Sequence, residues 1–270
     1  MPVAKINGLK VVYQRTGTGA PMLFIGGTGW DMRQHPNPRD SILAQQFDFV
    51  HYDQRGMGQS DKPPGPYKMV QFATDAVALA DGLAWERVHI VGYSFGGMVA
   101  QEIAIRWPDK VRSLVLCATT AGGAGGSSYA IEKFLALDPI ERARKGLEVA
   151  DKRFTADWQA ANPDEAAEMI SRRMKRQTQF VDHPGVHEGL VAQLHARAAH
   201  NTFDRLEQIT APTLVLVGEH DGQAPRGAQE SMAARIRQCS LQVLPGSHNF
   251  VFESDAAYHA IAEFCDTVKN

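Results

Sequence analysis

The sequence predicts an α/β core, in which a mostly parallel sheet is flanked by helices and interrupted by an inserted block of helices. Short apolar runs alternate with helical patterns up to about residue 121, which indicates parallel strands joined by crossover helices. A charge-rich stretch then runs to about residue 205 without a convincing strand, and strand-like runs resume after it. We therefore expect core segments at 1–121 and 206–270, and a helical cap insertion at 122–205.

Strands of the first core segment are predicted from apolar runs of about strand length. All but the first run carry few charges, as expected of strands buried on both faces. Helical spacing of apolar residues predicts helices at 69–84 and 95–107, the second ending at Pro108. The predicted strands are 9–13, 22–25, 47–52, 88–91 and 114–118.

The inserted block begins with the glycine- and serine-rich stretch 122–128, which is typical of a flexible loop. Breaks at Asp138-Pro139, Asn162-Pro163 and His183-Pro184 divide the rest of the block into three or four helices. Strands are predicted again at 213–217 and 241–244, followed by a last amphipathic helix at 255–268. The core therefore brackets the insertion.

Composition indicates a small-molecule partner. The formal net charge is −2 and the basic residues form no long block, which argues against a nucleic-acid groove or a polybasic membrane patch. No apolar stretch approaches the roughly 18 residues of a membrane span, and the first residues lack a signal-peptide pattern. Three scattered cysteines favour reduced thiols and a cytoplasmic protein. No feature of the sequence indicates an oligomeric state.

The strongest chemical motif is the segment from Val88 to Gly97, an apolar strand that runs through Gly-x-Ser-x-Gly into a helix. A sharp strand-to-helix turn needs glycine at positions 92 and 96 and leaves the Ser94 hydroxyl exposed. The start of the helix also directs N–H groups toward this serine, which suits a developing oxyanion. Ser94 is therefore the candidate nucleophile.

A serine nucleophile needs a base, and the chain offers one in the expected order after an acid. Asp221 follows one predicted strand and His248 follows the next, so both lie where strand ends converge at one edge of the sheet. His220 and Glu219 are the local rivals. His248 is the candidate general base, and Asp221 is the acid that orients it.

An oxyanion hole needs two converging donors. We expect one to be the backbone N–H of Phe95 and the other the backbone N–H of Thr28, with Gly27 as the alternative. Thr28 and Gly27 belong to the glycine-rich loop that follows the second predicted strand.

Together these segments resemble the α/β-hydrolase superfamily, and within it the capped serine esterases, enol-lactonases and cofactor-free perhydrolases. The resemblance implies the α/β-hydrolase fold and no cofactor. One departure is Gly26-Gly27, where many relatives have His-Gly, so this loop is expected to be supported differently. The segments that carry the resemblance are 24–30, 52–60, 92–97, 218–221 and 246–248.

The resemblance and the triad predict hydrolysis of a small carboxylic ester or lactone through an acyl-enzyme. Two alternatives stay open. The same triad serves C–C bond hydrolysis, perhydrolysis and lyase chemistry in similar proteins, and a hydrolase scaffold can also act as a ligand receptor. Relatives with aspartate in place of Ser94, such as haloalkane dehalogenases, are excluded.

The inserted helices are expected to shape the substrate pocket. Four histidines of the block lack the spacing of a metal site and are predicted to be solvated, so no metal is expected. The candidate pocket residues are apolar side chains from the loop after the second predicted strand and from the insertion: Trp30, Phe134, Leu135, Trp158, Met169 and Met174.

Overall fold

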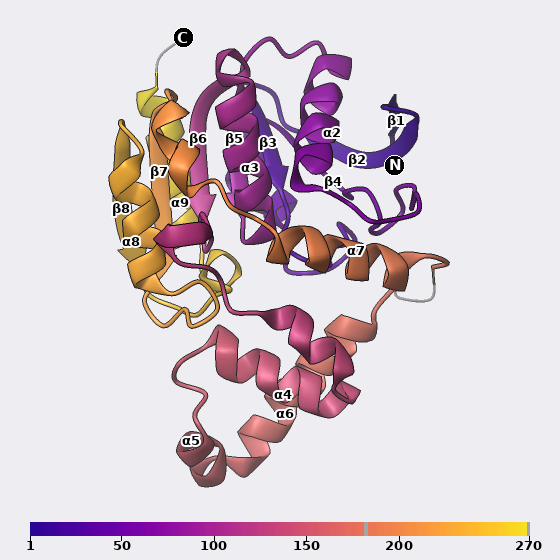
Figure 1. The fold of residues 1–270 in the computed structure, drawn as a ribbon, viewed down its shortest axis with the longest axis vertical. Helices are drawn as coiled ribbons and strands as arrows, with labels where there is room; N and C mark the ends of the chain where they lie inside the picture. The colour runs from indigo at the N-terminus through magenta and orange to yellow at the C-terminus, as the bar shows by residue number, and fades with distance from the viewer. Residues whose placement is uncertain (181–182, 269–270) are drawn as a thin grey trace.

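An eight-stranded sheet forms the core of the part that the computed structural model describes, residues 1–180 and 183–268 (Figure 1). The strand order is β1-β2-β4-β3-β5-β6-β7-β8. β1 pairs antiparallel with β2 and β2 with β4, and every later pair is parallel. The expected mostly parallel α/β sheet is confirmed. The strands are β1 (Val3–Ile6), β2 (Leu9–Thr16), β3 (Pro21–Ile25), β4 (Asp48–Tyr52), β5 (Val88–Tyr93), β6 (Val111–Cys117), β7 (Thr213–Gly218) and β8 (Cys239–Leu244).

The edges of the sheet depart from the sequence prediction because edge strands carry weaker apolar signals. β1 was not predicted; Val3 and Lys5 are exposed and only Ile6 of the strand is buried. The central strands β4, β5 and β7 are buried along their whole length, which explains why their apolar runs were clear in the sequence.

Helices cover both faces of the sheet, and the alternation of side chains along each strand serves both layers. On β6, Leu114 and Leu116 pack in the cluster that contains residues of α2, α3 and α8. Val115 and Cys117 point the other way, into the cluster of α1 and α9. These helices are α1 (Leu43–Gln46), α2 (Met69–Gly82), α3 (Phe95–Arg106), α8 (Arg226–Arg235) and α9 (Ala256–Thr267).

The helical segment, residues 118–212, connects β6 to β7. Figure 1 shows α4, α5 and α6 set apart from the sheet, with α7 leading back toward it. The predicted break at Asp138-Pro139 is the start of α4: the Asp138 carboxylate accepts hydrogen bonds from the Ile140 and Glu141 N–H groups. The α-helices of the segment are α4 (Pro139–Ala150), α5 (Ala156–Ala161), α6 (Pro163–Thr178) and α7 (Val186–Ala198). None of the helices in the described ranges is long and apolar enough to cross a membrane.

Candidate active site

Ser94 occupies a strained turn between β5 and α3. Its backbone has φ 53° and ψ −114°, a left-handed conformation that costs a non-glycine residue about 1–3 kcal/mol. The chain closes so tightly that a Cβ on Gly92 would lie 2.5 Å from the Gly96 carbonyl oxygen, and a Cβ on Gly96 would overlap the Ile25 carbonyl. Both motif glycines are therefore required by backbone contact.

His248 contacts both of its predicted partners. Its Nε2 lies 3.0 Å from the Ser94 Oγ, and its Nδ1 lies 2.9 Å from the Asp221 Oδ2. An ionised carboxylate can only accept, so we assign the ring proton to Nδ1, which leaves Nε2 as the acceptor for the serine hydroxyl. The His248 N–H donates to the Ala150 carbonyl at the end of α4, so the helical segment helps to hold the loop that carries the histidine.

The Asp221 carboxylate is fixed by the turn that follows β7. Its Oδ1 accepts the backbone N–H groups of Gln223 and Ala224, both at 2.8 Å, and both carboxylate oxygens lie near the imidazole, with Oδ1 3.0 Å and Oδ2 2.9 Å from His248 Nδ1. Asp221 is only 1% exposed. The rival acid Glu219 instead lies 3.7 Å from His220, and both of these side chains are solvent-accessible.

Gln223 is a site residue that the sequence interpretation missed. Its side-chain Nε2 lies 2.8 Å from His248 Nε2, so the amide and the Ser94 hydroxyl are both placed to donate to the same ring nitrogen. The available signal was its position two residues after Asp221, inside the turn that presents the acid.

The two expected oxyanion donors flank Ser94. Phe95 is the first residue of α3, so its N–H has no partner within the helix. Thr28 lines the same cavity as Ser94, and its N–H makes no hydrogen bond within the described ranges. The alternative, Gly27, packs closely: a Cβ on it would lie 3.0 Å from the Tyr93 ring and 3.5 Å from the Ser94 Cβ.

Two glutamine side chains support the loop that contains Gly26 and Gly27. The Gln54 amide donates to the Gly26 carbonyl at 3.0 Å, and the Gly29 N–H donates to the Gln193 side chain of α7 at 2.7 Å. The Met32 N–H further donates to the buried Asp53 carboxylate. These contacts hold the loop from two parts of the fold, the segment after β4 and helix α7.

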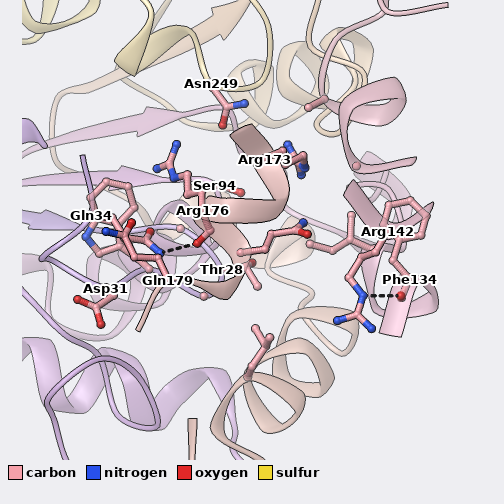
Figure 2. A pocket seen from close by; sticks show the side chains of 18 of the residues that line it. Thr28, Asp31, Gln34, Ser94, Phe134, Arg142, Arg173, Arg176, Gln179 and Asn249 are labelled. Atoms are coloured by element: carbon pink, nitrogen blue, oxygen red, sulfur yellow. Dashed lines mark hydrogen bonds between the residues drawn. The ribbon is translucent and has the colours of Figure 1, made fainter. Parts of the chain in front are cut away.

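A cavity of about 560 Å³ lies above Ser94, between the sheet and the helical segment (Figure 2). Of the expected pocket residues, Trp30, Phe134, Leu135 and Met169 line it. Trp158 and Met174 are not among its described lining residues, which corrects their expected position. Trp158, on α5, packs on Phe154 with ring centroids 5.4 Å apart.

The face of α6 explains the error at Met174. The residues of α6 that line the cavity recur at helical spacing, and Met174 falls outside that row. The sequence interpretation considered only apolar residues, but the row is mainly basic. It consists of Met169, Arg172, Arg173, Arg176 and Gln177.

The histidines of the insertion form no metal site. His183, His187 and His195 are exposed as expected, whereas His200 is buried and its ring lies 3.4 Å from the Thr202 hydroxyl. Within the ranges that the structure covers, no group of three His, Cys, Asp or Glu side chains is placed to hold a metal ion.

Comparison with known proteins identifies the family. The family model described as "Serine aminopeptidase, S33" (Hydrolase_4) matches residues 20–255. The chain belongs to this family. Its fold and relatives place it in the α/β-hydrolase superfamily, and the chain is an enzyme of the hydrolase class.

Three relatives illustrate the likeness. The enol-lactonase named "3-oxoadipate enol-lactonase 2" from Acinetobacter baylyi is 28% identical over 82% of this chain and 79% of its own. The crystal structure of the enol-lactonase from Burkholderia xenovorans LB400 is 26% identical with a TM-score of 0.77, covering 98% of this chain and 100% of that one. A thermophilic esterase from Thermogutta terrifontis is 26% identical with a TM-score of 0.78 over the full length of both chains.

Proposed function

We propose that this hydrolase cleaves a small carboxylic ester or lactone through an acyl-enzyme formed on Ser94. The observation that carries the proposal is the hydrogen-bonded chain from the Ser94 Oγ to His248 Nε2 at 3.0 Å and from His248 Nδ1 to Asp221 at 2.9 Å. A serine hydroxyl becomes a competent nucleophile when a neighbouring base takes its proton.

The first half of the reaction forms the acyl-enzyme. His248 Nε2 accepts the Ser94 proton as Oγ attacks the carbonyl carbon, and Asp221 stabilises the resulting imidazolium through Nδ1–H. The N–H groups of Phe95 and Thr28 bind the oxyanion of the tetrahedral intermediate. The imidazolium then returns the proton to the leaving oxygen, and the C–O bond breaks.

The second half releases the acid. A water molecule gives its proton to His248 Nε2 as its oxygen attacks the acyl carbon, and the same oxyanion donors stabilise the second intermediate. Collapse returns the proton to the Ser94 Oγ. We propose that the helical segment is the cap of this enzyme, because it supplies much of the cavity wall and the Ala150 carbonyl that holds the His248 loop.

Ser94→Ala tests the proposal. We expect the variant to fold normally and to lose turnover of para-nitrophenyl acetate and γ-butyrolactone, whereas Ser127→Ala, at an exposed serine of the helical segment, keeps wild-type rates. Mass spectrometry after rapid quenching should detect an acylated peptide that contains Ser94. Undiminished turnover by Ser94→Ala would reject the mechanism, and turnover by the wild type of a vinylogous diketone alone would assign the triad to C–C hydrolysis.

A further inference from the structure

Two arginines of α6 face the cavity above Ser94. Arg173 and Arg176 are three positions apart, so they share a face of the helix, and both line the cavity together with Ser94 and Asn249. Figure 2 labels Arg173 and Arg176 among the side chains of this cavity, together with Ser94 and Asn249, and shows Arg142 hydrogen-bonded to Phe134.

The other two cavity arginines are already engaged. Arg142 donates to the carbonyls of Phe134, Leu135 and Leu137, which fixes it as a structural brace. Arg172 is exposed and donates to Glu168 one turn earlier on α6. Arg173 and Arg176 are therefore the cavity arginines whose side chains make no hydrogen bond or ion pair within the described ranges.

Arg173 is held in the cavity wall without a carboxylate partner. Its Nε is fully buried and has no hydrogen-bond partner, and neither Arg173 nor Arg176 forms an ion pair within the described ranges. Burial lowers the pKa of Arg173 to about 10, and the like charge of Arg176 lowers it further. The side chain therefore stays charged at neutral pH, although an unpaired buried charge costs free energy.

The guanidinium of Arg173 packs directly against α4. A Cβ on Gly146 of α4 would lie 2.6 Å from both the Nε and the Nη2 of Arg173, so a larger residue there would displace the guanidinium from its present position. Arg176 in turn lies over the Trp30 ring, with its Cζ 5.8 Å from the ring centroid. The two positive charges also act on Tyr93, the residue before Ser94: they oppose the raised pKa that burial gives its phenol.

We propose that Arg173 and Arg176 form an anion subsite that binds a carboxylate carried by the substrate of Ser94. The inference rests on the proposed function and names its substrate class, an ester or lactone with a free carboxylate. A guanidinium presents paired N–H donors that match a carboxylate. Substrate binding would supply the counter-charge that α6 lacks, while the apolar residues Leu135, Met169 and Leu190 contact the carbon chain.

Matched substrates test this in the wild type. Phenyl hydrogen glutarate is compared with its neutral amide, phenyl glutaramate, to place the charge on the acyl side. Para-acetoxybenzoate is compared with para-acetoxybenzamide to place it on the alcohol side. We expect the carboxylate member of at least one pair to be preferred by about ten- to a hundredfold in kcat/KM, the range of hydrogen bonds to charged groups. Equal rates within both pairs would reject the subsite.

Substitutions assign the preference to residues. Arg173→Gln is expected to raise KM for the carboxylate substrate about tenfold or more while kcat and the rate on the neutral partner change little, because uniform binding is lost. Arg173→Lys should restore part of the preference through its charge. The control is Lys175→Gln, which removes one charge from an exposed position of the same helix and should preserve the preference. An equal loss on both substrates in Arg173→Gln would indicate a structural role only.

A binding measurement separates this proposal from the proposed function. Glutarate, glutaramide and inorganic phosphate are titrated into the Ser94→Ala variant by isothermal calorimetry. This measurement reports binding alone and does not depend on turnover. Glutarate should bind about tenfold or more tightly than glutaramide, and Arg173→Gln should remove the difference. If every ester is inert but glutarate binds in this way, the subsite stands and the esterase assignment fails. If esters are cleaved but glutarate does not bind, or phosphate binds as tightly, the carboxylate subsite is rejected.

Discussion

At the scale of single residues, the Asp221 carboxylate contacts both its own turn and His248. Oδ1 accepts two backbone N–H groups, and both oxygens lie close to His248 Nδ1, with Oδ2 the nearer at 2.9 Å. In Asp221→Asn the amide oxygen can keep the backbone contacts, which turns the NH₂ group toward the imidazole and forces its proton onto Nε2. We expect kcat to fall by about 10³–10⁴-fold with little loss of stability, measured by ester turnover and thermal unfolding. A loss below tenfold would show that Asp221 does not set the tautomer.

A substitution at Gly27 tests whether the loop after β3 supplies an oxyanion donor, because the added side chain would displace the loop. In Gly27→Ala the new methyl group would lie 3.0 Å from the Tyr93 ring and close to the Ser94 Cβ, so the loop must shift by a few tenths of an ångström. We expect kcat/KM to fall by about tenfold or more, because small displacements of catalytic donors are costly. Gly82→Ala is the matched control, since nothing lies near its added methyl group. Equal activity of the two variants would argue against a donor in this loop.

Arg173 is also expected to lower the free energy of unfolding. The Arg173 guanidinium has no ion-pair partner in the described ranges, and its Nε is buried without a hydrogen bond. An apolar side chain at this position would remove that unsatisfied group. We expect Arg173→Met to unfold at a higher temperature, with a gain of about 1–2 kcal/mol, whereas Lys175→Met on the exposed side of α6 changes little. A clear loss of stability in Arg173→Met would mean that favourable packing outweighs the charge penalty.

At the scale of secondary-structure elements, helix α4 connects the helical segment to the candidate triad, and its N-cap residue Asp138 stabilises that helix. The Asp138 side chain accepts the Ile140 and Glu141 N–H groups, and the far end of α4 supplies the carbonyl that accepts the His248 N–H. Asp138→Ala should cost about 1 kcal/mol of unfolding free energy, measured by chemical denaturation. The control is Lys133→Ala at an exposed position, and equal stability of both variants would show that the cap contributes nothing.

Sequence predicts the central elements well and the edges poorly, for a physical reason. A strand buried on both faces must be apolar throughout, so β5 and β7 were evident from their runs. The edge strand β1 has only one buried residue, Ile6, and left no such run. The breaks at Asp138 and Pro163 predicted helix starts because capping and proline chemistry act locally.

The candidate site likewise contains residues that the sequence predicts and residues that only the structure reveals. Ser94, Asp221 and His248 were predicted together because each follows a strand, and parallel strands bring their ends to one edge. Gln223 and Arg173 were missed because their importance comes from contacts across the fold, with His248 and Gly146. No local pattern distinguishes such a glutamine or arginine from a solvated one.

At the scale of the whole molecule, buried titratable groups set the response to acid. His51, His89 and His200 are almost fully buried, and desolvation, their largest cause, lowers the pKa of each to about 4. In the unfolded chain a histidine titrates near 6.5. Between these values the unfolded chain binds protons that the folded protein excludes, so stability falls as the pH is lowered from about 6.5 to 4.

Asp53 changes the pH dependence of stability in the opposite direction from the three histidines. Burial raises the pKa of its carboxyl to about 7, above the value near 3.9 of an unfolded aspartate. The folded protein therefore binds a proton between these values that the unfolded chain does not, which adds stability as the pH falls. One such group offsets roughly one of the three histidines.

The summed contributions of the three histidines and Asp53 predict that the free energy of unfolding drops by about 3 kcal/mol between pH 7 and pH 5. Denaturant titration at each pH measures this change. His89 isolates the cause, because its Nδ1 pairs with the Ser113 hydroxyl inside the sheet and Gln can replace it without a titrating group. His89→Gln should flatten the pH dependence by about 2 kcal/mol whatever its stability at pH 7. His187→Gln, at an exposed position, should retain the wild-type slope. A slope unchanged in His89→Gln would mean that His89 is protonated in the folded protein, and that the acid response comes from other groups.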